Sequence, residues 1–390
     1  MSDPCPVCAS LRSIALDARA DVPIIMNRVY ETAKAGLAAP RGPLELVGCQ
    51  VCGFVWNRAF QAELITYDGD YENDQTHSMA FSDHLRARAE DVVAAVPQDE
   101  RVDYLEIGCG QGRFIVEVAR AAGDRLASAE GFDPAWRGKD GEGPAGSRIH
   151  NVYFNAQTAG RLTRPPNVVA SRHTIEHVPD PVAFLTALRT ALGPDARARV
   201  FIETPCVSWI FEQQAMQDFF YEHCSLFTAY ALGIALQKAN FRSPRVEHVF
   251  GGQYLWASAA TYGPDEVLQT GQPVGLQNLA GARAHFAEHW REQVRAAAAR
   301  GPVALWGAGA KGVTFALMTD PERRFIDHVV DINPSKQNRY IAGSGLVVLG
   351  PEEAAKRGAV TIFVMNPNYF DEIEMAAADA GMNARLVPIN

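Results

Sequence analysis

The sequence predicts an α/β protein built from doubly wound sheets. Short apolar strands alternate with amphipathic helical stretches through the middle of the chain, as at residues 167–171, 183–192 and 198–203. Two glycine-rich loops, 108–112 and 307–312, each join a strand to a helix. This alternation places parallel strands between layers of helices. A chain of 390 residues is long enough for two or three domains, each with its own core.

Composition and charge narrow the range of partners. The net charge of −9 argues against a general nucleic-acid or anionic-membrane surface. Residues 1–5 lack the basic region and apolar run of a signal peptide, and no apolar stretch is long enough to cross a bilayer. We therefore expect a cytoplasmic protein that acts on a small molecule and binds neither nucleic acid nor membrane.

The N-terminal region carries two CxxC pairs, which predict a metal site. An odd total of seven cysteines in a reducing compartment makes a disulfide framework a poor interpretation. Two such pairs can supply four thiolates to one tetrahedral zinc, and a closed site of this kind is structural. The predicted ligands are Cys5, Cys8, Cys49 and Cys52. Free or redox-active thiols are the alternative.

Breaks in the pattern suggest four segments: an N-terminal module at 1–88, a core at 89–270, a helical connector at 271–300 and a C-terminal domain at 301–390. The first segment ends in a polar, aromatic stretch. Its candidate substrate-binding residues are Tyr67, Tyr71 and His77, with His84 nearby. These residues form a lid over the cleft if the stretch folds there, and a solvated linker if it does not.

The first glycine loop points to a nucleotide-like cofactor. A predicted strand ends in Glu106, and Gly108, Gly110 and Gly112 follow before the next helix. The glycines allow a tight turn and a close approach of a ligand to the helix N–H groups. Asp133, at the end of the next strand, can hold ribose hydroxyls. An ordinary tight turn is the alternative. This E-x-G-x-G-x-G pattern resembles class I S-adenosylmethionine (SAM) methyltransferases, which implies SAM as the cofactor.

A second polar cluster follows the strand at 167–171. Residues 172–181 resemble the H-x-x-E-H-x-x-D-P turn found after the fourth strand in many SAM methyltransferases. The resemblance implies that His173 and Glu176 help to position the cofactor and substrate. A metal site is the alternative, with His173 and His177 or Glu176 and His177 as ligands, although no third ligand with helical spacing is visible in the sequence.

The strongest acid–base candidate is the run Tyr221, Glu222 and His223, which lies among aromatic residues. An imidazole titrates near neutral pH, and an adjacent carboxylate can orient it or raise its pKa. We therefore predict these three residues as catalytic. The alternative is an aromatic turn in the core, with a solvated Glu222 and a hydrogen-bonded His223 that take no part in chemistry.

The C-terminal segment repeats the strand, glycine loop and helix, with Asp331 at the end of its next strand. Lys311 lies near the end of the loop, and the last predicted strand ends at Asn366 and Asn368. These features fit a Rossmann-like unit that binds a nucleotide, with Lys311, Asn366 and Asn368 as substrate-binding candidates. A docking module that binds no ligand remains an equal alternative.

The order of these features resembles the three-domain C-methyltransferases that build branched deoxysugars. Residues 309–312 (GAKG) and 331–337 (DINPSKQ) carry the resemblance in the C-terminal segment. It implies a class I SAM methyltransferase core between an N-terminal zinc-binding module and a C-terminal Rossmann-like domain. It also implies a nucleotide-linked 4-keto sugar as substrate, with the nucleotide between the outer modules. His223 is then the general base, and Glu222 tunes it.

The sequence also departs from that family. Family members usually read Tyr-His-Glu-His, but Phe220 stands at the tyrosine position and Tyr221 at the first histidine. The loop at 307–312 lacks a common proline, and residues 366–369 (NPNY) replace a tryptophan-asparagine pattern. We therefore predict a SAM-dependent methyltransferase that methylates carbon, with O- or N-methylation as the first alternative. A non-enzymatic zinc-containing assembly protein is the second alternative.

Overall fold

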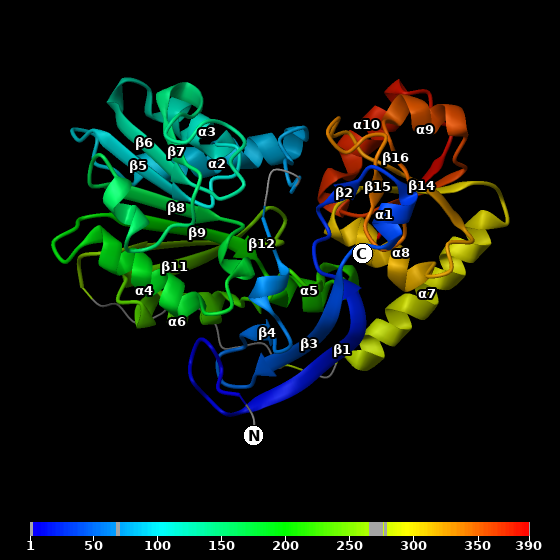
Figure 1. Ribbon diagram of the computed structural model, residues 1–390, viewed down its shortest axis with the longest axis horizontal. Coiled ribbons are helices and arrows are strands. Elements are labelled where there is room, and N and C mark those ends of the chain that lie inside the picture. The colour runs from blue at the N-terminus through cyan, green and yellow to red at the C-terminus, as the bar shows by residue number, and fades with distance from the viewer. Residues whose placement is uncertain (1–2, 68–70, 265–275, 277–278, 390) are drawn as a thin grey trace.

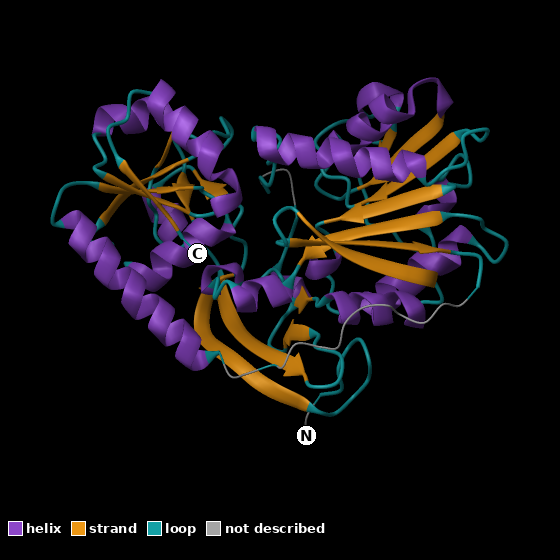
Figure 2. Cartoon of the chain, turned by 180° about the vertical axis from the view of Figure 1, so that it is seen from behind, coloured by secondary structure: helices purple, strands orange, loops and turns teal. Residues whose placement is uncertain are grey.

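The structure is a computed structural model that describes residues 3–67, 71–264, 276 and 279–389. Two α/β units stand side by side, and an antiparallel β-module lies beneath them (Figure 1). Seen from behind, the long helix α7 (Ala280–Ala298) runs along the outer edge of the C-terminal unit (Figure 2). Among the described helices, none has both the length and the apolar character needed to cross a membrane.

The described residues of the central unit form a seven-stranded sheet, which confirms the predicted α/β class. In spatial order its strands are β11 (Arg242–Val249), β12 (Tyr254–Ala260), β9 (Arg199–Pro205), β8 (Val168–Arg172), β5 (Val102–Ile107), β6 (Leu126–Phe132) and β7 (Arg148–His150). The strands from β9 to β7 are parallel. In contrast, β12 pairs antiparallel with both β9 and β11. The turn at residues 250–253, which joins β11 to β12, is too short for a parallel crossover.

Helices cover both faces of the central sheet. One face carries α2 (Met79–Ala94) and α3 (Arg113–Ala122), and the other carries α4 (Pro181–Leu192) and α6 (Ala229–Lys238). Side chains alternate across each strand, so Tyr104 packs with the first pair of helices and Leu105 with the second. Burial on both faces explains why β8 begins with an unbroken apolar run at residues 168–170.

The C-terminal unit is a smaller parallel sheet with the same layering. Its strands in spatial order are β16 (Val348–Leu349), β14 (Ile326–Val330), β13 (Val303–Trp306), β17 (Thr361–Val364) and β18 (Arg385–Pro388). Helices α7 and α8 (Ala310–Thr319) pack on one face, and α9 (Pro351–Arg357) and α10 (Phe370–Asp379) on the other. The ring centroid of Trp290 in α7 lies 5.9 Å from the ring centroids of both Phe315 and Phe363, so this helix belongs to the C-terminal core.

The N-terminal module joins the two α/β units. Its sheet has the order β1 (Ser13–Pro23), β3 (Arg41–Cys49), β4 (Val55–Asn57) and β10 (Ser225–Leu226), and β10 comes from the chain that follows β9. A separate pair links β2 (Val29–Tyr30) to β15 (Tyr340–Ile341) of the C-terminal unit, next to α1 (Ala33–Leu37). The module therefore holds the two α/β units through main-chain hydrogen bonds to both.

The helix boundaries refine the expected segments. The boundary expected at residues 88 and 89 falls inside α2, whose Phe81 and Leu85 pack in the central core. The helix begins at its cap Ser78, because the Ser78 hydroxyl accepts a hydrogen bond from the N–H of Phe81 at 3.0 Å. The break expected at residues 271–273 lies outside the described residues, and the predicted connector is described as α7.

Candidate active site

The first glycine loop adopts the tight turn that the sequence predicts. Gly108, Gly110 and Gly112 all have positive φ angles, and a Cβ on Gly108 would lie 2.0 Å from the Thr174 hydroxyl oxygen. The Asp133 carboxylate accepts hydrogen bonds from the N–H groups of Gly110 and Ala135, both at 2.7 Å. Burial raises the pKa of Asp133. The loop and the carboxylate thus form one rigid cradle at the carboxyl ends of β5 and β6.

This cradle lines a cavity of about 350 Å³, which we call the loop cavity. Among the predicted cofactor residues, Glu106, Gly108, Gly110, Asp133 and His173 line it, whereas Gly112 starts α3 beside it. Glu106 is 2% exposed, and burial raises its pKa to about 8. Its Oε2 atom has no hydrogen-bond partner in the described part of the chain, so a ligand amino or hydroxyl group can pair with it.

A buried charge network closes the floor of the loop cavity. The Glu203 carboxylate is fully buried and contacts Arg172 and His173 at 2.8 Å and His84 at 2.9 Å. Burial would raise the pKa of Glu203, but the charge of Arg172 and the hydrogen bonds from both histidines bring it well below its usual value. Strands β8 and β9 place Arg172 and Glu203 in register. The network fixes His173 at the end of β8.

A second cavity of about 670 Å³ lies between the three units, and we call it the interdomain cavity. Residues from the N-terminal module, the core and the C-terminal unit line it, including Asn27, Glu176, His223, Lys311 and Asp331. The two cavities share part of their lining. The shared residues are Asn73, Asp74, Gln75, His173 and His177. A group bound in one cavity is therefore separated from the other by only these side chains.

His223 lies on this shared side of the interdomain cavity. Its ring centroid is 4.9 Å from that of His177 and 4.1 Å from that of Phe220. Two contacts hold the His223 loop against the turn after β8: Ser225 Oγ donates to the Val178 carbonyl at 2.6 Å, and Cys224 Sγ to the Glu176 carbonyl at 3.6 Å. Segments that are distant in the sequence thereby place two imidazoles face to edge.

The histidines differ in their protonation. Burial and then the neighbouring charges of His177, His173 and Lys311 lower the pKa of His223 well below its usual value. Burial also lowers the pKa of His177. For His173 burial acts in the same direction, but Glu176 and Glu203 outweigh it and raise the pKa to about 9. At neutral pH the site therefore holds a neutral His223 beside a protonated His173.

Neither Tyr221 nor Glu222 lines either cavity, although the Glu222 carboxylate contacts Tyr71 of the loop cavity. The Tyr221 hydroxyl accepts a hydrogen bond from the Gln61 N–H at 2.9 Å, and its ring packs against Phe60. Glu222 is fully buried and accepts a hydrogen bond from the Met26 N–H at 2.9 Å. Burial raises the pKa of Glu222 to about 7. Both side chains anchor the His223 loop to the N-terminal module, and we do not retain them as catalytic candidates.

The C-terminal glycine loop has the same construction as the first loop, but its surroundings differ. The Asp331 carboxylate accepts a hydrogen bond from the Ala308 N–H at 2.8 Å. The Asn27 side-chain oxygen accepts one from Ala310 N–H, the first amide of α8, at 3.3 Å. Lys311 forms an ion pair with Asp218 at 2.7 Å. The interdomain cavity is lined by Asn27, Asp218, Ala310, Lys311 and Asp331, but not by Ala308.

The remaining substrate-binding candidates fall into two groups. Tyr67 and Tyr71 line the loop cavity with their rings 5.1 Å apart, and the Tyr67 hydroxyl lies 2.7 Å from His177 Nδ1. His77 and Asn366 line the interdomain cavity. Asn368 does not line it, and its amide donates to the Phe250 carbonyl at 3.0 Å. Asn368 therefore fastens the C-terminal unit to the β11–β12 turn.

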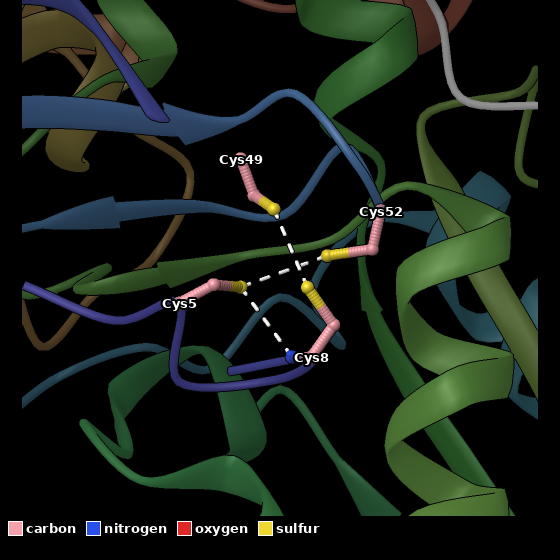
Figure 3. Close-up of side chains that lie close together, drawn as sticks. All are labelled: Cys5, Cys8, Cys49 and Cys52. Carbon is pink, nitrogen blue, oxygen red and sulfur yellow. Dashed lines mark hydrogen bonds between the residues drawn. The ribbon is translucent and has the colours of Figure 1, made fainter. Parts of the chain in front are cut away.

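The four predicted zinc ligands converge at the edge of the N-terminal module, and their ligand atoms lie within 4.8 Å of one another (Figure 3). The Cys5 and Cys52 sulfurs are 3.6 Å apart, and the Cys8 and Cys49 sulfurs 3.4 Å apart. None of these cysteines is in a disulfide. The N–H groups of Cys8 and Val51 point at the sulfurs of Cys5 and Cys49, at 3.5 and 3.4 Å. This all-sulfur donor set fits a tetrahedral zinc.

Sequence reasoning found some residues of the site and missed others. The end-of-strand rule predicts that residues 172–177 face the cleft, and Arg172 and His177 of this segment do line the cavities. Glu203 follows the same rule, and this signal could have found it. Asn27 lies in an irregular stretch, and no local pattern in the sequence links it to the glycine loop of the C-terminal unit.

Comparison with protein families matches two domain models to the chain. Residues 81–243 match a methyltransferase domain, and residues 272–387 match a C-methyltransferase C-terminal domain. The C-methyltransferase NovU of Streptomyces niveus is 24% identical over 394 residues, which cover 95% of this chain and 91% of NovU. The similarity therefore extends over all three units.

Solved structures resemble parts of the chain. A SAM-dependent methyltransferase from Aquifex aeolicus is 15% identical, with a TM-score of 0.34 over 48% of this chain and 94% of its own. The plantazolicin methyltransferase BpumL, in complex with SAH, is 13% identical, with a TM-score of 0.35 over 48% of this chain and 85% of its own. Similarity at this level carries no information about the substrate.

Proposed function

We propose that this chain, a divergent member of the SAM-dependent C-methyltransferases, methylates a carbon beside the carbonyl group of a small molecule such as a nucleotide-linked keto deoxysugar. One observation carries the proposal: the loop cavity and the interdomain cavity meet at His173 and His177, with His223 beside them. Methyl transfer requires this arrangement, because donor and acceptor have to approach in line while a base removes a proton.

In this proposal SAM occupies the loop cavity. Asp133 accepts the ribose hydroxyls, the glycine loop lets the ligand approach its backbone closely, and the unpaired Glu106 oxygen accepts from the methionine amino group. Gly112 lets α3 begin close to the ligand. His173, at the shared wall, and Glu176, which lines the interdomain cavity, help to position the methyl group.

His223 is the proposed general base. Its lowered pKa keeps the imidazole neutral and able to accept a proton at neutral pH. The nitrogen takes the proton from the carbon next to the carbonyl, and the C–H electron pair moves into an enolate. That carbon then forms a bond to the methyl group as the methyl–sulfur bond breaks. The protonated His173 is close enough to the shared wall to stabilise the developing negative charge.

The nucleotide part of the substrate is proposed to lie toward the C-terminal unit. The second glycine loop, Lys311 and Asp331 line that part of the interdomain cavity, together with His77 and Asn366. Because Lys311 is paired with Asp218, a diphosphate would have to share its charge with that carboxylate. Tyr67 and Tyr71 line the loop cavity and so face the sugar only where the two cavities meet.

We propose a structural zinc at the Cys5, Cys8, Cys49 and Cys52 cluster. Four thiolates close the coordination sphere and leave no position for a substrate. The site fastens the N-terminal residues to the β3–β4 turn. Bound zinc would supply folding free energy to the module that anchors the His223 loop.

Product analysis with ¹³C-methyl SAM tests the function. A new C–CH₃ signal in the product supports the proposal, whereas an O–CH₃ or N–CH₃ signal supports the alternative and contradicts it. His223→Ala is expected to lower kcat by about 100-fold or more, the usual contribution of a general base. Tyr221→Phe is the matched control in the same loop, and it should retain activity because its hydroxyl faces Gln61. Undiminished turnover by His223→Ala would remove the base assignment.

A further inference from the structure

A cluster of metal-ligand type lies inside the interdomain cavity, away from the cysteine site. Glu176, His177 and His223 each bring one ligand atom to within 4.8 Å of the others. We propose that these three side chains form a second metal site that binds a divalent transition-metal ion, and that His223 cannot act as a base while the ion is bound. The inhibition rests on the proposed function of His223, whereas the metal binding does not.

The donor set selects the class of ion. Two imidazoles and one carboxylate suit zinc, nickel, cobalt or ferrous iron, whereas calcium and magnesium prefer oxygen ligands. Three protein ligands leave at least one coordination position open. That position faces the cavity, because all three residues line it.

A buried carboxylate oxygen without a hydrogen bond independently points to a missing ligand. Glu176 is fully buried, and its Oε1 atom has no hydrogen-bond partner in the described part of the chain. This oxygen forms a long ion pair with His173 Nδ1, at 3.5 Å. The other oxygen is fixed by the Thr204 hydroxyl, which donates to it at 3.0 Å. An unsatisfied buried oxygen is costly, and a metal ion would satisfy it.

His177 has the second contact that metal-binding histidines commonly have. Its Nδ1 atom lies 2.7 Å from the Tyr67 hydroxyl, which fixes the orientation of the ring. His177 also hydrogen bonds to the main-chain carbonyl of Glu222, and a bound ion has to displace this contact. The positive charges of His173 and Lys311 further oppose a cation here. We therefore expect reversible binding that is weaker than binding at the four cysteines.

Metal binding and proton abstraction need the same part of the site. A ligating nitrogen of His223 has its lone pair in the metal bond and cannot accept a proton. Within the described residues the His223 ring has ring contacts with Phe220 and His177 but no hydrogen-bond partner, so it can turn toward Glu176 and His177 without breaking a hydrogen bond. Filling the site would thus switch off the base without any change of fold.

Cobalt titration of the full-length, zinc-loaded protein tests the site. We expect one Co²⁺ to bind beyond the structural zinc, seen as visible d–d bands without the charge-transfer band of a thiolate–cobalt bond. Glu176→Gln and His223→Asn should each weaken this binding by about tenfold or more. His289→Asn is the matched control, because His285 and His289 lie on one face of α7 with rings 6.5 Å apart and offer a competing surface site.

The outcomes separate the two halves of the inference. Loss of the signal in Glu176→Gln and His223→Asn, with inhibition of methyl transfer over the same Co²⁺ range, supports both. No cobalt beyond the cysteine site, or a signal lost only in His289→Asn, overturns the metal site whatever the activity. Cobalt binding that leaves turnover unchanged or raises it overturns the inhibitory role. Circular dichroism of Glu176→Gln excludes misfolding as the cause of a lost signal.

Discussion

The two glycine loops of this chain have the same local geometry, but they differ in the residues that surround them. Each follows a parallel strand, starts a helix and is held by a carboxylate from the next strand: Asp133 accepts from the Gly110 N–H at 2.7 Å, and Asp331 from the Ala308 N–H at 2.8 Å. The first amide of α8 is then occupied by Asn27 of the N-terminal module. In the described structure no side-chain oxygen from another unit caps the start of α3.

The difference shows what a glycine loop determines and what it leaves open. The loop supplies a helix terminus with exposed N–H groups, which can bind an anion or a side chain equally well. The first loop lines a cavity whose described lining comes from the core and the N-terminal segment and includes no residue of the C-terminal unit, so the loop is available to a cofactor. At the second loop a side chain from another unit already takes one group, and any ligand competes with the interface between the units.

The largest expected effect concerns the layer beneath the first loop. Glu203→Gln leaves Arg172 buried without its carboxylate, which we expect to cost about 3–5 kcal/mol of unfolding free energy at pH 7. The folded-state pKa of Glu203 is lowered, so its stabilising contribution is present above the unfolded value and is lost as pH falls. Urea unfolding at neutral and acidic pH should show the difference between wild type and variant shrinking on acidification.

The control is Asp331→Asn, which removes a carboxylate charge under the second loop that has no buried arginine as its partner among the described residues. Because Asp331 accepts hydrogen bonds from the N–H groups of Ala308 and Asn333 and lies 4.0 Å from Lys336, we expect a cost of about 1 kcal/mol. Equal losses in the two variants would mean that the buried network does not distinguish the loops.

The Glu203 network also illustrates how much of the site could be predicted from sequence. Strand ends and glycine loops are local patterns, and they located Gly108, Asp133 and Asp331. The end-of-strand rule places Glu203 at the same edge, but only the register of β8 and β9 shows that it is buried against Arg172.

The orientation of the His223 loop could not be predicted from the sequence, because it depends on pairing between distant segments. β10 joins β4, and this anchors Tyr221 and Glu222 in the N-terminal module while His223 alone faces the cavity. Three consecutive polar residues gave no sign of which one would point into the site. The same pairing brings His223 to Glu176, the third ligand that helical spacing could not show.

The next largest expected effect comes from replacing one glycine in each loop with alanine, because the two glycines differ in backbone conformation. Gly108→Ala forces a side chain into a positive φ and places its Cβ 2.0 Å from the Thr174 hydroxyl oxygen. We expect SAM affinity to fall on the order of 100-fold, about 2.7 kcal/mol. Gly309→Ala meets the Asn27 side chain at 3.3 Å without a positive φ, and it should leave SAM affinity unchanged. Isothermal titration with SAM compares the two, and similar losses would show that the C-terminal loop contributes to the cofactor site.

The smallest effect tests the interface directly, through two substitutions of Asn27. Asn27→Ala removes the acceptor for the first amide of α8 and should cost about 1 kcal/mol, as the loss of a helix cap does. Asn27→Asp keeps an acceptor at this helix terminus, and its negative charge is favourable there, so stability should be retained. The two variants therefore differ in stability in a known direction.

Their affinity for an anion should differ in the opposite direction if the second loop binds a diphosphate. Asn27→Ala frees the Ala310 amide for a phosphate oxygen, whereas Asn27→Asp places a carboxylate where that oxygen would sit and should weaken binding of a nucleoside diphosphate about tenfold, ~1.4 kcal/mol. Titration calorimetry beside thermal unfolding measures both quantities. If stability changes as expected while diphosphate affinity stays the same in both variants, the terminus of α8 is purely a docking contact. The second glycine loop would then hold the units together, and the nucleotide would have to bind elsewhere in the interdomain cavity.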